Sequence, residues 1–99
     1  MTNQLQRKLL ELAGPSASIT YSRSSDWNST TFEGQRHILT LLFTNAQHGY
    51  NFMFSVREEG EDLVSLCGHT LCELKVTDSD EIVTLGHVTV TVEALTLKD

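Results

Sequence analysis

Residues 27–43, WNSTTFEGQRHILTLLF, constrain the fold more than any other stretch of this chain. Between residues 36 and 43, apolar side chains occupy both odd and even positions, so both faces of the predicted strand are largely apolar. Such a strand is typical of the centre of a sheet or of a sheet covered on two sides. The dipeptide Glu33-Gly34 predicts a reversal just before it, because glycine readily adopts a positive φ. We therefore expect two strands that fold back on each other at the centre of a small sheet.

The segment before this hairpin carries weaker strand signals. Residues 19–24 alternate between larger side chains and Ser or Thr, which is typical of a half-buried strand. The composition of residues 25–28 predicts a turn, and the threonine-rich residues 29–32 favour a strand. The first half of the chain is thus expected to contribute three strands.

An amphipathic helix is predicted close to the first residue. Leu5, Leu9 and Leu12 recur at i, i+4 and i+7, and Gln, Arg, Lys and Glu occupy the opposite face. Gly14-Pro15 predicts where this helix ends, since glycine suits the left-handed position after a helix and proline cannot continue it. A helix of about three turns is marginal alone, so we expect its leucines to pack on the sheet.

A long hairpin is predicted at the other end of the chain. Residues 62–78 alternate well, and residues 77–80 have the composition of a reversal. Residues 82–97 form the second strand, with the valines at 88, 90 and 92 facing inward. Near its end the apolar phase shifts to Leu95 and Leu97, which indicates a β-bulge or the end of the sheet.

Three short motifs resemble a known group of proteins. The pattern W-x-S-x-T-F-x-G-x-R-H spans residues 27–37, and a Leu-x-Gly-His element at 66–69 and a Val-Glu-Ala-Leu-Thr ending at 92–96 follow it. On these residues the chain resembles a family of short, uncharacterised bacterial proteins, mostly alphaproteobacterial. The chain departs from the family pattern at Cys67 and at residues 71–73, where the family has Pro and Val-Ala-Asp. The resemblance spans most of the chain and implies no activity.

Residues 45–59 fit two patterns. Their aromatic side chains alternate as in a strand, and the same side chains also fit helical spacing. Asn45 is a good N-cap and Gly60 suits the end of a helix, whereas Gly49 lowers helical propensity. The resemblance implies a helix here, and we adopt that interpretation.

The predicted element order is therefore α-β-β-β-α-β-β over a single domain, residues 1–99. Runs of strands separated by helices predict an α+β fold, in which two helices pack on one face of an antiparallel sheet. A chain of 99 residues is close to the commonest domain size.

The charge balance excludes some partners. Seven basic and thirteen acidic residues give a net charge of −6, which disfavours binding to nucleic acid or to an anionic membrane surface. No apolar run approaches the length of about 20 residues that a membrane helix needs, and the N-terminal stretch is unlike a secretory signal. We expect a cytoplasmic protein that acts on neither membranes nor nucleic acid.

Trp27, Arg36 and His37 are candidate binding residues. Arg36 and His37 are neighbours on a predicted strand, so their side chains leave opposite faces and cannot act together on one substrate atom. We interpret His37 as a hydrogen-bonded residue at the edge of the core and Arg36 as the partner of an acid on the other face. A ligand pocket near these residues is the functional alternative. Trp27 either fills the core or anchors a partner, because exposed aromatic side chains are enriched in binding hot spots.

His69, His87 and the two cysteines form a second candidate group. The spacing of Cys67, His69 and Cys72 matches no recognised zinc pattern, and strand alternation sends Cys72 to the other face. We therefore expect two reduced cysteines. The predicted hairpin places His87 opposite Leu71 and diagonal to His69, about 7–8 Å away. Two surface histidines are the simple interpretation, and a shared metal or anion is the functional one.

These observations favour a binding protein over an enzyme. The sequence shows no catalytic constellation, phosphate-binding loop or basic surface. The leading hypothesis is a non-catalytic domain that binds another protein, or a second copy of itself, without a cofactor or resident metal. The alternative is a small-ligand or metal-binding module that uses His69, His87 and Cys67, or the pocket near Trp27. An enzyme ranks third, and the sequence does not decide that point.

Overall fold

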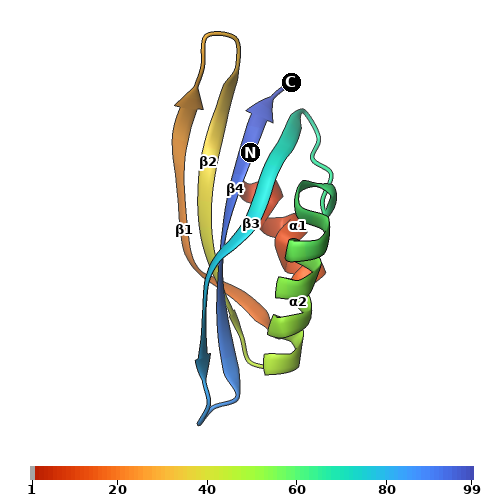
Figure 1. Cartoon of the computed structure of the whole chain (residues 1–99), viewed down its shortest axis with the longest axis vertical. Helices are drawn as coiled ribbons and strands as arrows, with labels where there is room; N and C mark the ends of the chain where they lie inside the picture. Colours follow the sequence, from red (N-terminus) through yellow and green to blue (C-terminus); the bar gives the residue numbers. More distant parts are fainter. Residues whose placement is uncertain (1) are drawn as a thin grey trace.

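The computed structural model of the protein describes residues 2–99 (Figure 1). The elements are α1 Thr2–Ala13, β1 Ala17–Asn28, β2 Glu33–Phe43, α2 Ala46–Glu59, the short 3₁₀ helix η1 Gly60–Asp62, β3 His69–Ile82 and β4 His87–Lys98. All strand pairs are antiparallel, in the order β1-β2-β4-β3. The α+β class, the antiparallel sheet and the two helices on one face confirm the prediction.

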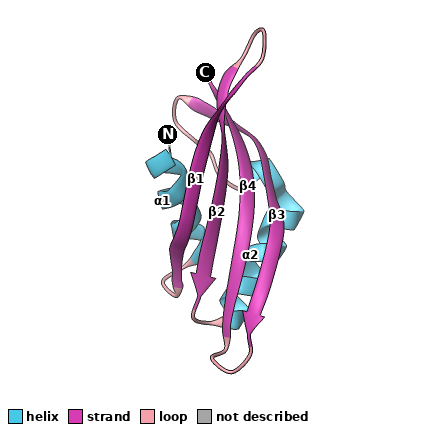
Figure 2. Cartoon of the chain, turned by 90° about the vertical axis from the view of Figure 1, so that its left-hand side faces the viewer, coloured by secondary structure: helices cyan, strands magenta, loops and turns pink. Residues whose placement is uncertain are grey.

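The molecule is an elongated two-layer structure, 48 × 21 × 20 Å. Both helices lie behind the sheet in Figure 2, which leaves the other face of the sheet uncovered. The β1–β2 hairpin and the β3–β4 hairpin project from opposite ends in Figure 1. Neither helix of residues 2–99 is long and apolar enough to cross a membrane.

Both helices form for the reasons that their sequences indicate. Leu5 and Leu9 are fully buried, and Gly14 ends α1 with a φ of 91°, as the pattern predicts. Asn45 caps α2, since its side-chain oxygen accepts a hydrogen bond from the amide of His48 at 3.2 Å. Residues 45–59 are thus helical, which resolves the ambiguity in that segment.

The core lies between the helices and the two central strands. In β2 the odd-numbered residues from His37 to Phe43 are buried, and in β4 the even-numbered residues from Val88 to Thr96 are buried. Rings of β2 and α2 meet here, because the centroids of Phe43 and Phe52 are 5.5 Å apart. The alternation of apolar residues in the sequence predicts these inward-facing sets.

One turn, at residues 29–32, replaces the two reversals that the sequence predicts at 25–28 and 33–34. Residues 25–28 belong to β1, and the turn is at 29–32, where the amide of Ser29 donates to the carbonyl of Phe32 at 2.9 Å. Gly34 lies inside β2 rather than in a turn. Pairing with β2 continues to the last residue of β1, and these ladder hydrogen bonds outweigh the local turn preference. Two long strands therefore replace the three predicted.

The second hairpin is also displaced along the chain. Residues 62–68 lie outside the strand, β3 runs through the predicted reversal at 77–80, and the actual turn occupies residues 83–86. The polar residues 77–80 are exposed along a projecting ribbon, where a strand tolerates them. The turn closes on Gly86, whose φ of 67° suits glycine.

The phase shift predicted in the last strand lies in its partner instead. β4 alternates regularly, with Leu95 and Leu97 on the uncovered face. The irregularities fall in β3, between Leu71 and Glu73 and between Val76 and Asp78. The first of them turns Leu71 and Leu74 both toward the core.

Candidate interaction surfaces

The predicted site residues divide between the two faces of the sheet. Trp27 pairs with Gly34 across β1 and β2, on the same side as Arg36, and this side faces away from the helices. His37 points to the opposite side, into the core. The alternation of β2 therefore separates Trp27 and Arg36 from His37, as strand geometry predicts, and these residues do not form one pocket.

Arg36 belongs to a row of charges on the uncovered face. Its Nη1 lies 2.5 Å from Oε1 of Glu93 on β4, and 4.0 Å from Oε1 of Glu73 on β3. Glu73 in turn contacts Nζ of Lys75 at 3.1 Å. The expected acid partner of Arg36 is thus confirmed as Glu93. Two positive and two negative side chains balance one another across three strands.

His37 is held by hydroxyl groups on both ring nitrogens. Oγ of Ser24 lies 2.8 Å from Nδ1, and Oγ1 of Thr96 lies 2.9 Å from Nε2. A neutral imidazole carries one N–H, so one of these hydroxyl groups accepts from the ring and the other donates to it. Burial lowers the pKa of His37 below its ordinary value, and His69 lowers it further. Both nitrogens are engaged, which confirms the interpretation as a hydrogen-bonded residue at the edge of the core.

The predicted proximity of His69 and His87 is wrong. His69 pairs with Lys98 and His87 pairs with Ile82, so the two histidines lie at opposite ends of the β3–β4 ribbon. The cause is the later turn, which moves His87 away from Leu71. Within residues 2–99, no group of three or more His, Cys, Asp or Glu side chains is placed to hold a metal ion.

Cys67 precedes β3 instead of sharing a strand face with His69. Its amide donates to Oε1 of Gln4 at 2.6 Å, which fastens this loop to α1. Cys67 and Cys72 are both free and exposed, so the prediction of reduced cysteines is confirmed. Their exposure shows that neither packs as a core residue.

His69 lines a hollow of about 520 Å³ at one end of the sheet. The hollow is polar and its lining includes Asp26, Asn28 and Lys98, which are exposed. Nδ1 of His69 is buried and has no hydrogen-bond partner among the described residues. Thr96 also lines this hollow, so its hydrogen-bond partner His37 lies close by.

The sheet face that no helix covers is a surface that the sequence analysis did not identify. We call it the open face. Its apolar members are only partly buried or exposed, and they lie outside the core cluster. They are Tyr21, Trp27, Ile38, Leu42, Leu95 and Leu97. Antiparallel sheets commonly expose a polar face to solvent, and the apolar residues on this one indicate a contact surface.

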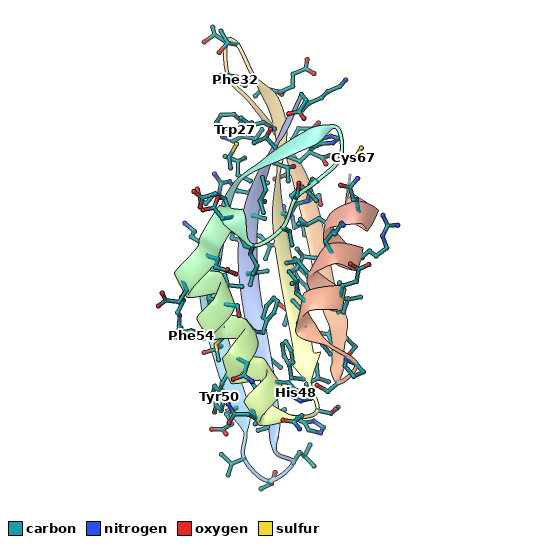
Figure 3. All side chains as sticks on the ribbon, turned by 90° about the vertical axis from the view of Figure 1, so that its right-hand side faces the viewer. Trp27, Phe32, His48, Tyr50, Phe54 and Cys67 are labelled. Carbon is teal, nitrogen blue, oxygen red and sulfur yellow. The ribbon has the colours of Figure 1, made fainter. Side chains whose placement is uncertain are left out.

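Exposed apolar side chains also gather at the two hairpin turns and on α2. Phe32 is exposed at the β1–β2 turn, and Tyr50 and Phe54 are exposed on α2 (Figure 3). The β3–β4 turn carries three exposed aliphatic residues between positions 82 and 85. The signal for that turn is present in the sequence as IVTLG, where apolar residues precede a glycine.

Comparisons with known proteins bear on the fold. The chain matches no protein-family model, and the search of curated proteins found no match. Among solved structures, the fold is similar to a chain described as "Virion of native gene transfer agent (GTA) particle". The TM-score is 0.56 and the identity 11%, over 98% of this chain and 94% of that chain. At this identity the similarity concerns the fold alone.

Proposed function

We propose that this protein is a structural subunit that joins a multi-protein particle through the open face, without catalysing a reaction. The observation that carries the proposal is the open face itself. One side of a four-stranded sheet carries partly buried Trp27, Leu95 and Leu97 with no layer packed against them. Apolar surface of this kind is stabilised when a protein partner removes it from water.

The charges on the open face suit a protein partner. Arg36, Glu93, Glu73 and Lys75 neutralise one another, so a partner that covers them leaves no unpaired charge. Paired charges within an apolar surface set the orientation of a partner more than its affinity. The balance gives no reason to expect a strongly charged partner such as nucleic acid.

The structural comparison supports an assembly role. The similar solved chain comes from a virion particle, and subunits of such particles function by contact with other protein chains. We propose the same kind of assembly role for the present protein. The cytoplasmic location and the family resemblance that the sequence suggests are part of this proposal.

Capture from the native host tests the proposal. The tagged wild-type protein is expected to co-purify with protein partners in a complex of high mass, measured by light scattering and mass spectrometry. Trp27→Ala on the open face is expected to lose these partners. The matched control is Phe54→Ala, which removes an exposed aromatic ring from α2 on the helix side. Phe54→Ala is expected to keep the partners. If Trp27→Ala keeps them as well, the open face is not the docking surface.

A second candidate function rests on the unpartnered Nδ1 of His69. This atom is buried, and its residue lines a hollow that a small polar molecule or an ion could enter. Ligands that bind only the folded state raise the melting temperature. If zinc or a small anion such as phosphate raises the melting temperature of the wild type but not that of His69→Ala, the result supports ligand binding. No shift for either variant would remove this candidate.

A further inference from the structure

The β3–β4 hairpin ends in an apolar tip that projects from the molecule. Ile82, Val83 and Leu85 are 38%, 77% and 63% exposed, although turns usually carry polar residues and glycine. Two backbone hydrogen bonds close the turn: the amide of Leu85 donates to the carbonyl of Ile82 at 3.1 Å, and the amide of Gly86 donates to the carbonyl of Val83 at 3.2 Å. We call these three aliphatic residues the tip. An apolar knob of this kind is suited to insertion into a cavity.

The stem of the hairpin is fixed to the body of the molecule. Tyr50 and Met53 of α2 line one hollow together with Glu81 and Val88 of the hairpin, and the nearby Glu81 raises the pKa of Tyr50 above its ordinary value. The tip therefore extends from an anchored ribbon, at the end of the molecule where α2 begins (Figure 1). A preorganised knob loses little conformational entropy on binding.

A groove lies between the two helices. It has a volume of about 280 Å³, and its apolar lining consists of Leu12, Ala13, Pro15, Phe52 and Leu63. Leu12 belongs by spacing to the apolar stripe of α1, yet it is 47% exposed at this groove, whereas Leu5 and Leu9 are fully buried. The stripe thus continues past the core of its own chain, and the groove offers apolar surface that nothing covers.

Charge around the tip and around the groove is complementary. The stem carries Asp78, Asp80 and Glu81, and no Lys or Arg occurs between Lys75 and Lys98. A second concave surface shares Gly14 and Pro15 with the groove and extends along α1 past Glu11 to Arg7. With Lys8, this helix carries two basic residues and one acidic residue. An acidic stem beside a helix with a small positive excess favours one orientation of the contact.

We infer that the tip of one copy inserts into the helix groove of a second copy of this chain. Both halves of the contact occur on the same polypeptide, so the occupant is present wherever the protein is. The contact joins two different patches, and it either closes as a reciprocal pair or passes from copy to copy. This inference rests on the proposed assembly role for its purpose, but its groove lies on the helix side of the sheet and its tip at the end of the β3–β4 hairpin, so neither includes the apolar residues of the open face.

Sedimentation and light scattering of the purified full chain test this contact. We expect the wild-type protein to self-associate as its concentration rises toward the solubility limit. Val83→Asp at the tip and Leu12→Asp at the groove are each expected to weaken self-association by at least about tenfold, because each places a charge in an apolar contact. The mass of the wild-type species distinguishes a reciprocal dimer from a longer assembly.

Mixing the two variants separates this contact from others. The Val83→Asp chain keeps an intact groove and the Leu12→Asp chain keeps an intact tip, so an equal mixture is expected to recover association as a dimer. The control Phe32→Asp places the same charge on the exposed aromatic residue of the other hairpin and is expected to associate like the wild type. Circular dichroism verifies that each variant is folded.

Several outcomes overturn the inference. A strictly monomeric wild type does so, and so does undiminished association of Val83→Asp. If Val83→Asp loses self-association while Leu12→Asp associates like the wild type, the contact is tip to tip and the groove is not involved. Trp27→Ala is expected to leave self-association unchanged, so failure of the tip contact and failure of the open-face proposal give different results.

Discussion

Gly34 lies directly against the backbone of Thr96. A β-carbon built on Gly34 would overlap the carbonyl oxygen of Thr96 and lie 2.8 Å from Cδ2 of Leu97. Gly34 has no positive φ, so the expected need for a left-handed backbone is wrong at this position. Close approach of β2 and β4 is what requires glycine here.

Substitution of Gly34 is therefore expected to destabilise the fold. Gly34→Ala should lower the free energy of unfolding by about 3 kcal/mol, and Gly34→Val by more, because backbone atoms cannot move aside as a flexible side chain can. Urea denaturation measures the effect, with His69→Ala as the comparison variant. Equal denaturation midpoints for Gly34→Val and His69→Ala would contradict this account of the β2–β4 contact.

The protein is expected to become less stable as the pH is lowered from neutral, because of His37. Its folded-state pKa lies below the unfolded value near 6.5, so the unfolded chain binds more protons in this range. The contribution of neutral His37 to the free energy of unfolding is therefore complete above about pH 6.5. It decreases as the pH falls, by up to about 1.4 kcal/mol per pH unit. Denaturation at about pH 7.5, 6.5 and 5.5, a range that spans the titration of histidine, measures the slope.

The variant His37→Gln isolates this contribution. Glutamine keeps hydrogen-bonding groups for Ser24 and Thr96 but carries no titratable proton. The difference in stability between wild type and variant is expected to narrow as the pH falls. A difference that stays constant across the range would show that another group causes the pH dependence.

Local patterns were sufficient to predict the parts of the fold that depend on periodicity. The buried positions of β2 and β4, the caps at Asn45 and Gly14, and the opposite directions of Arg36 and His37 all follow from spacing. The partners of Arg36 and His37 cannot be predicted from spacing. Glu93 and Thr96 lie far along the chain, and only the register of β2 with β4 brings them into contact.

The errors share a physical cause, which is competition between local composition and strand pairing. Residues 25–28 and 77–80 have the composition of turns, but each continues a strand because its neighbour offers ladder hydrogen bonds. The displaced second turn alone separates His69 from His87. Periodicity predicts that Leu12 faces the core, but it cannot show that the second helix leaves a groove there.

The cap of α2 is expected to contribute measurably to stability. Asn45 accepts a hydrogen bond from the amide of His48, so Asn45→Ala leaves that amide without its partner and should cost about 1 kcal/mol. Asn51→Ala on the same helix is the control, because Asn51 is exposed and accepts only from the side chain of Gln47. Thermal denaturation that lowers the melting temperature equally for both variants would argue against capping.

The pair formed by Arg36 and Glu93 is expected to be coupled but modest in strength. Although Nη1 and Oε1 are only 2.5 Å apart, the two side chains are 33% and 23% exposed, so water screens the attraction. A double-mutant cycle of Arg36→Ala and Glu93→Ala should give a coupling free energy of about 1 kcal/mol at low ionic strength. The coupling should decrease in about 1 M salt, where the screening length is shortest. A coupling that does not respond to salt would instead indicate that the arginine stem packs on the open face, since its methylene groups also cover apolar surface there.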